Sequence, residues 1–194
     1  MKFVTQYLAF ALVAALLLVS CKKEEEPDME PDNTVNNANV TELATPSQGN
    51  PTTVTGNVSE GEVLESLDWA ALSNVACFPA TRFVEFEGKL LYYSVNIPQG
   101  NEMRITVTPT GDKRRINVYG YINYDGNNTP PVQSVTSCEA GYELYVGEPD
   151  LTKDGEPQSI SFAQAVNRDF TVFIAVSGAR DVLEGDFELT AELL

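Results

Sequence analysis

Apolar and polar residues alternate with a period of two over much of the chain after Pro79. In residues 91–97 the odd positions are apolar and more polar residues lie between them, and the alternation returns over residues 103–107. This period is typical of β-strands that bury one face. The turn-forming residues 98–101, Pro-Gln-Gly-Asn, separate the two segments. We therefore expect these two strands to pair side by side in antiparallel fashion.

Further segments show strand patterns. Residues 170–176 are apolar on both faces, which predicts a central strand. Short strands separated by Gly, Pro, Asn and Asp, without alternating helices, indicate an all-β fold, an antiparallel β-sandwich. We expect the domain to cover residues 61–194, with its core beginning near residue 79. The additional predicted strands are residues 116–121, 159–162, 170–176 and 187–193.

A short helix is predicted at residues 66–72, ahead of the strands. Ser66 is a suitable N-cap, and Asp68 lies in the first turn, where a carboxylate is favourable. The single Trp of the chain, Trp69, falls in this segment. We expect it to pack against the domain, and a role as a ligand platform is the alternative.

The N-terminus has the pattern of a secretory signal peptide. Lys2 precedes an apolar run, residues 8–19, that is too short to span a bilayer as a helix. The sequence Leu18-Val19-Ser20-Cys21 resembles the lipobox of bacterial lipoproteins, which implies cleavage before Cys21 and acyl chains on that residue. Two or more acyl chains would anchor the protein to a membrane without a transmembrane helix. An ordinary secretory signal is the alternative.

The residues after Cys21 are expected to form a disordered, acidic tether, residues 21–60. They are rich in Asn, Thr, Pro and acidic residues and have almost no aromatic side chains. The run Lys22-Lys23-Glu24-Glu25-Glu26 resembles the export signal of Bacteroidota-type surface lipoproteins. It implies a lipid-anchored protein of the outer membrane that faces outward, or faces the periplasm if the signal is not used. A solvated charge run is the alternative.

Charge and composition exclude several classes of function. With 12 basic and 28 acidic residues, the net charge is −16, which disfavours a nucleic-acid partner. The chain has no His, so His-based catalytic triads and His-containing zinc sites are excluded. Because the chain has 28 acidic residues, some carboxylates must lie close together, and no particular pair can be identified as catalytic. Asp181, Glu184 and Asp186 are expected to form a solvated turn.

The order of the strand motifs resembles the bacterial pre-peptidase C-terminal domain. The resemblance covers about 100 residues. It implies a β-sandwich of jelly-roll type, an accessory module of secreted enzymes with no catalytic residue of its own. The segments around Cys77 and Cys138 are also similar to uncharacterised surface lipoproteins built on such a domain. The motifs are residues 91–100, 103–107, 116–119, 170–177 and 185–189.

The resemblance also bears on the cysteines. In many such domains a Cys at the position of Cys138 pairs with a neighbouring strand, but that partner position is Ile160 here. With Cys21 assigned to the lipid, we expect a Cys77–Cys138 disulfide, and two separate buried thiols are the alternative.

A candidate ligand surface lies on the strand at residues 116–121. If Ile116 and Val118 face the core, the neighbouring aromatic and amide side chains face outward, where they suit sugar rings or a protein partner. The alternative is that the second sheet covers these rings. The candidate contact residues are Asn117, Tyr119, Tyr121, Asn123 and Tyr124.

Two segments, residues 125–128 and 150–156, are candidates for metal binding. Both segments offer side-chain oxygens to Ca²⁺, but neither has the spacing of a tight calcium loop. We therefore expect plain turns and no cofactor, and binding of Ca²⁺ is the alternative.

These features together predict a non-enzymatic surface lipoprotein. Its β-sandwich would bind an extracellular polysaccharide or a partner protein. A structural or accessory subunit of an outer-membrane assembly is the alternative.

Overall fold

The computed structural model describes residues 39–72, 74–112, 114–123, 129–132, 135–144, 155–163 and 168–194. Strands dominate these residues, and all six strands predicted from the sequence are present, as β4, β5, β6, β8, β9 and β10. The elements in chain order are β1 (Val40–Glu42), β2 (Thr52–Asn57), the 3-10 helix η2 (Val58–Glu60), β3 (Glu62–Val63), α2 (Asp68–Leu72), the 3-10 helix η3 (Ala80–Glu85), β4 (Lys89–Ile97), β5 (Glu102–Pro109), β6 (Ile116–Ile122), β7 (Ser137–Gly141), β8 (Gln158–Ala163), β9 (Phe170–Gly178) and β10 (Asp186–Leu193).

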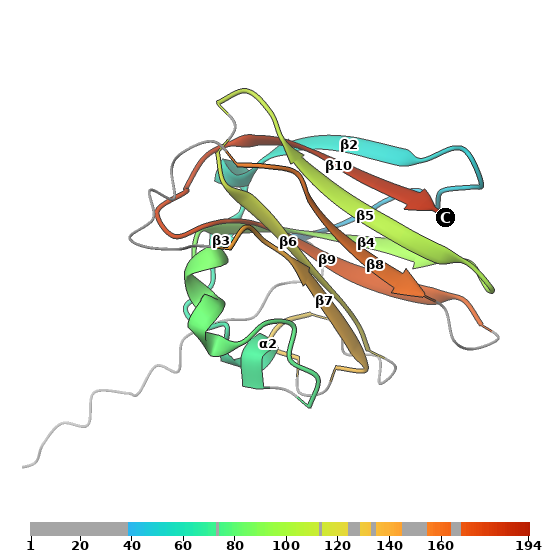
Figure 1. Cartoon of the computed structure of the whole chain (residues 1–194), viewed down its shortest axis with the longest axis horizontal. Coiled ribbons are helices and arrows are strands. Elements are labelled where there is room, and N and C mark those ends of the chain that lie inside the picture. Colours follow the sequence, from blue (N-terminus) through green and yellow to red (C-terminus); the bar gives the residue numbers. More distant parts are fainter. Residues whose placement is uncertain are drawn as a thin grey trace, which may run out of the picture. The chain divides into compact units, whose positions relative to one another are not determined.

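The strands form a two-sheet sandwich with jelly-roll connectivity (Figure 1). Four antiparallel pairs, β2 with β10, β4 with β9, β5 with β8 and β6 with β7, join the first four of these eight strands to the last four. This double ribbon is rolled into two sheets, in the orders β2-β10-β5-β8 and β4-β9-β6-β7. The strands β1 and β3 add to the outer edge of β4. The predicted all-β sandwich of jelly-roll type is therefore confirmed.

The predicted pairing of the two strands around residues 98–101 is wrong. Gly100 does make a turn, with φ of +77°, but β4 and β5 belong to different sheets. The apolar residues of both strands enter the same core from opposite sides, for example Val95 and Ile105. Alternation along a strand determines which face is apolar, but not which strand lies beside it. The turn therefore crosses from one sheet to the other.

The predicted central strand is confirmed. β9 lies between β4 and β6, and both of its faces are covered. Val172, Ile174 and Val176 face the core between the sheets, whereas Ala175 belongs to a second apolar cluster outside this sheet.

The expectation that residues 39–60 are disordered is wrong. Residues 40–42 form β1, which pairs in parallel with β4, and residues 52–57 form β2, which pairs along β10. Val58 is fully buried and Leu43 nearly so. β2 is an edge strand with one face toward the core, so it needs few apolar residues, and its composition resembles that of a disordered segment. The domain in the described part of the chain therefore starts at residue 39, not 61.

The sheet that contains β6 also has a cover on its outer face. This cover, here called the cap segment, consists of residues 64–72 and 74–86 and includes α2 and η3. Ser66 Oγ accepts a hydrogen bond from the backbone N–H of Asp68, the first residue of α2, at 3.1 Å, while the carbonyl of Leu67 accepts the first backbone hydrogen bonds of the helix. Figure 1 shows α2 beside β6 and β7. The four-stranded sheet β2-β10-β5-β8 instead exposes polar residues on its outer face.

Candidate functional site

The aromatic strip predicted as a ligand surface is part of the core. Tyr119 and Tyr121 project from the outer face of β6, as expected, but both are completely buried. The cap segment covers them, not the second sheet. The ring of Trp69 lies 5.3 Å from that of Tyr121, and Phe78 lies 5.6 Å from Tyr119, centroid to centroid. Trp69 is therefore a packing residue, and the strip offers no surface to a ligand.

The hydroxyl groups of this cluster are also enclosed. Tyr92 and Tyr119 share a buried hydrogen bond of 2.8 Å between their hydroxyl oxygens. Burial raises the pKa of Tyr92, Tyr119 and Tyr121, because the charged phenolate is poorly solvated inside the protein. These groups stay neutral at physiological pH and act as structural elements.

The remaining predicted contact residues do not restore that surface. Asn117 is 3% exposed, and its side-chain amide donates a hydrogen bond to the backbone carbonyl of Glu85 at 2.7 Å. Asn123 is half-buried. Tyr124 lies outside the described residues, as do Cys21 and the predicted export signal, residues 22–26.

The disulfide prediction is confirmed. Cys77 and Cys138 are bonded, with their Cα atoms 4.7 Å apart. Cys77 belongs to the cap segment and Cys138 to β7, so the disulfide fixes the cap to the sheet that it covers. It closes a loop with a sequence separation of 61 residues.

A buried carboxylate lies at the end of η3. Glu85 is fully buried, and neither of its side-chain oxygens has a hydrogen-bond partner within the described part of the chain. The nearest cation is Arg82, at 3.9 Å from Oε1. Burial raises the pKa of Glu85 despite the lowering effect of Arg115 and Arg82. The group is covered on all sides, so it does not form an accessible site.

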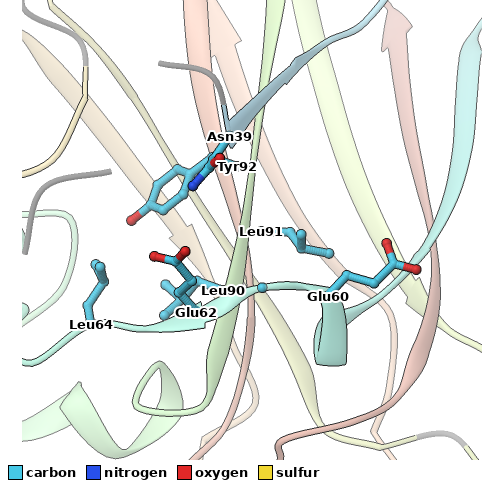
Figure 2. A pocket seen from close by; sticks show the side chains of 8 residues that line it. Asn39, Glu60, Glu62, Leu64, Leu90, Leu91 and Tyr92 are labelled. Atoms are coloured by element: carbon cyan, nitrogen blue, oxygen red, sulfur yellow. The ribbon is translucent and has the colours of Figure 1, made fainter. Parts of the chain in front are cut away.

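A groove of about 220 Å³ lies along the outer edge of β4. β1 covers residues 92–94 of that edge and β3 covers residues 89 and 90, so Leu91 falls between them. Figure 2 shows the carboxylates of Glu60 and Glu62 on either side of Leu91, with Asn39 beside the ring of Tyr92. We call this hollow the acidic groove. It is lined by Asn39, Glu60, Gly61, Glu62, Leu64, Leu90, Leu91 and Tyr92.

Gly61 allows the acidic groove to form. A Cβ atom at this position would lie 2.0 Å from the carbonyl oxygen of Leu90, so only Gly lets β3 approach β4 this closely. The preceding turn is held by Lys89, whose Nζ donates to the carbonyl of Ser59 at 2.8 Å. The glutamates on either side of Gly61 are both exposed. Burial, and to a smaller extent the charge of Glu60, raises the pKa of Tyr93 to about 12.

A second hollow of about 240 Å³ adjoins the acidic groove, and the two share Leu64 as a wall. We call it the side hollow. Its lining also combines exposed carboxylates, Glu65 and Asp68, with apolar side chains. It is lined by Leu64, Glu65, Ser66, Leu67, Asp68, Phe83 and Glu87.

Sequence reasoning missed the acidic groove. Asn39 and the lining residues from Glu60 to Leu64 fall in the predicted tether and at the predicted domain boundary, where no periodic pattern marks them, whereas the other three belong to β4. The only local signal is Gly61 between two glutamates. Because the groove depends on the pairing of β1 and β3 with β4, its position follows from contacts between segments that are distant in sequence.

The outer face of the four-stranded sheet is a hydroxyl surface. Thr53, Thr190, Thr106 and Ser159 lie in register across β2, β10, β5 and β8. The hydroxyl groups of Thr53 and Thr190 share a hydrogen bond of 3.1 Å, and those of Thr106 and Ser159 share one of 2.8 Å. The neighbouring outward positions on these strands are mostly Thr, Ser, Glu and Arg. This face therefore provides no aromatic platform on which sugar rings would stack.

The turn with Asp181, Glu184 and Asp186 is exposed, as expected. Two of these residues, Asp181 and Glu184, line a third hollow of about 330 Å³ together with Arg114. Charges of both signs therefore meet at this hollow, which distinguishes it from the acidic groove.

In the resolved ranges no three Cys, Asp or Glu side chains gather as a metal site would require. Residues 125–128 and 150–154 of the two calcium candidates lie outside those ranges. No helix among the described segments has the length and apolarity to cross a bilayer.

No established protein family and no curated protein matches the chain by sequence. Among solved structures it is similar to the pre-peptidase C-terminal domain of collagenase from Bacillus anthracis, with 11% identity and a TM-score of 0.42 over 79% of this chain and 94% of that one. It is also similar to CorA, a surface-associated copper-binding protein of Methylomicrobium album BG8, with 7% identity and a TM-score of 0.38 over 80% of this chain and 100% of that one. A third is PliG, a periplasmic inhibitor of g-type lysozyme from Aeromonas hydrophila, with 8% identity and a TM-score of 0.29 over 80% and 99%. At such low identities and TM-scores, the likenesses carry no argument about family, ligand or activity.

Proposed function

We propose that this chain is a membrane-anchored, non-catalytic surface lipoprotein whose β-sandwich binds a partner protein. The single observation that carries the binding role is the acidic groove, an open hollow with an apolar wall and exposed carboxylates. Polysaccharide binding is less well supported, because Tyr119 and Tyr121, the aromatic residues on which sugar rings were expected to stack, are buried.

The anchoring role rests on the sequence alone. The apolar run of residues 8–19 followed by Ser20-Cys21 supports cleavage and acylation at Cys21, and residues 22–26 support export to the cell surface. Only about 17 residues separate Cys21 from Asn39, where the described domain begins. A chain of that length spans at most about 60 Å. The domain would therefore stay close to the membrane.

This short reach favours a second candidate function, a permanent subunit of an outer-membrane assembly. Affinity purification of the tagged chain from intact cells distinguishes the two. A protein recovered in a fixed one-to-one ratio after stringent washing indicates the subunit, whereas substoichiometric, salt-sensitive recovery indicates a capture module.

The anchoring is tested by metabolic labelling with an alkyne fatty acid, combined with protease treatment of living cells. We expect the wild-type chain to be labelled and to be digested on intact cells, and a Cys21→Ser variant to lose the label. An unlabelled wild-type chain, or one that resists protease until the cells are lysed, contradicts the anchored or the surface-exposed form, respectively.

A further inference from the structure

Four carboxylates around the two neighbouring hollows have no ion-pair partner in the described part of the chain. Glu60 and Glu62 belong to the acidic groove, and Glu65 and Asp68 to the side hollow. All four are exposed, and none forms a salt bridge with a described residue.

Three basic residues of neighbouring segments have other partners. Lys89 donates to the carbonyl of Ser59, and Arg180 pairs with Glu87. Arg82 is oriented toward the buried Glu85. Among the described residues, the negative charge around the two hollows is therefore not neutralised by ion pairs.

The size of the hollows indicates the kind of ligand. Sites for small molecules usually have volumes of about 300–1,000 Å³. The acidic groove and the side hollow measure about 220 Å³ and 240 Å³, so each suits a single side chain better than a whole cofactor or metabolite. Small pockets that receive individual side chains are typical of protein interfaces.

The lining indicates which side chain fits. Leu64 forms a wall of both hollows, Leu91 adds to the first and Phe83 to the second. Lys and Arg place an aliphatic stem along apolar surface while their charged end stays at a polar rim. The combination of apolar side chains and exposed carboxylates in the lining of the two hollows matches that division of the side chain.

The arrangement at a sheet edge indicates the conformation of the partner. β3 is two residues long and pairs with β4 in the described structure. Extended peptides bind beside such edges and place alternate side chains in successive pockets. We infer that the acidic groove and the side hollow together bind an extended segment of a partner protein that carries Lys or Arg at two alternate positions. This inference rests on the proposed binding function and names the chemistry of the partner.

The test uses the purified full-length mature protein in detergent and a fluorescein-labelled peptide, Ser-Lys-Ser-Lys-Ser, with blocked ends. Binding is followed by fluorescence anisotropy at low and physiological salt. Exposed ion pairs contribute roughly 0.2–1 kcal/mol each. We therefore expect the double variant Glu62→Gln/Glu65→Gln to weaken binding about fivefold.

The matched control is Glu188→Gln. Glu188 is an exposed glutamate on the outer face of β10, so its replacement changes the net charge without touching either hollow. We expect it to weaken binding less than twofold, and a Ser-Glu-Ser-Glu-Ser peptide not to bind. The single variants Glu62→Gln and Glu65→Gln are compared with this control. If the control weakens peptide binding as much as either of them does, only net charge matters and the inference is overturned.

Other occupants give distinct results. If millimolar CaCl₂ displaces the Lys peptide and raises the melting temperature only when Glu62 is intact, the site holds a cation and the inference is wrong. If neutral oligosaccharides bind and the Lys peptide does not, it is also wrong. The Cys21→Ser variant should bind the peptide like the wild type, so failure of the anchor and failure of the groove are separate outcomes.

Discussion

Removal of the Cys77–Cys138 disulfide gives the most quantitative test of the structure. Replacing both residues by Ala avoids leaving a single buried thiol. In the chain-entropy account, a cross-link restricts the unfolded chain in proportion to the logarithm of the loop that it closes. The sequence separation of 61 residues corresponds to about 4 kcal/mol of unfolding free energy at 25 °C. This is a large share of the 5–15 kcal/mol typical of whole domains.

The location of the disulfide predicts which part of the protein unfolds first when the disulfide is removed. Cys77 lies in the cap segment, and Trp69 of the same segment packs on Tyr121. Without the cross-link, the cap segment is held by noncovalent packing alone. We expect the fluorescence of Trp69 to change at a lower urea concentration than the far-ultraviolet circular dichroism of the sheets.

The assay is urea unfolding of the oxidised wild type and the double Ala variant, followed by both signals. With a urea dependence of about 2 kcal/mol/M, a loss of 4 kcal/mol lowers the midpoint by about 2 M. A shift below about 0.5 M would refute the reasoning. So would two titratable thiols per chain in the unreduced, denatured Cys21→Ser protein, because the disulfide would then not exist.

Three further substitutions test other parts of the structure by urea unfolding. Tyr119→Phe leaves the buried hydroxyl of Tyr92 without its partner and should lower stability by about 1–3 kcal/mol. Adding Tyr92→Phe should recover most of that loss, and an additive loss would contradict the shared hydrogen bond. Glu85→Gln should stabilise the protein by about 1 kcal/mol at pH 7. The pKa of Glu85 is raised in the folded state, so the stability of the wild type falls as pH rises above the ordinary value of 4.5, and the advantage of the variant should vanish at pH 4. An equal advantage at both pH values would contradict this cause. Gly61→Ala should cost about 1–3 kcal/mol, since its Cβ meets the backbone of Leu90, and an unchanged midpoint would show that β3 does not approach β4 so closely.

Local pattern sufficed for the strands and for the short helix. The alternation in residues 91–97 and the apolar run in residues 170–176 correctly predict β4 and β9. Burial of one or both faces of a strand determines which consecutive residues are apolar, so it can be recognised from a short stretch of sequence. The short helix α2 also lies within the predicted residues 66–72, and Ser66 bonds to its first N–H, an interaction between residues two positions apart.

Composition was a poorer guide at the edge of the domain. Residues 52–57 are mostly Thr, Gly and Asn, and yet they form β2, because hydrogen bonds with β10 and a few inward residues such as Val54 hold an edge strand in place. No property of these residues alone distinguishes that outcome from disorder.

The amino-acid sequence by itself determined the all-β class, the positions of most strands and which of their faces are apolar. Only the tertiary structure decided that β4 and β5 belong to different sheets, that the cap segment buries Tyr119 and Tyr121, and that Glu60 and Glu62 flank a groove. The physical reason is the range of the interactions. Side-chain alternation is set by nearest neighbours, whereas strand order, the covering of a sheet face and the shape of a groove depend on contacts between distant segments.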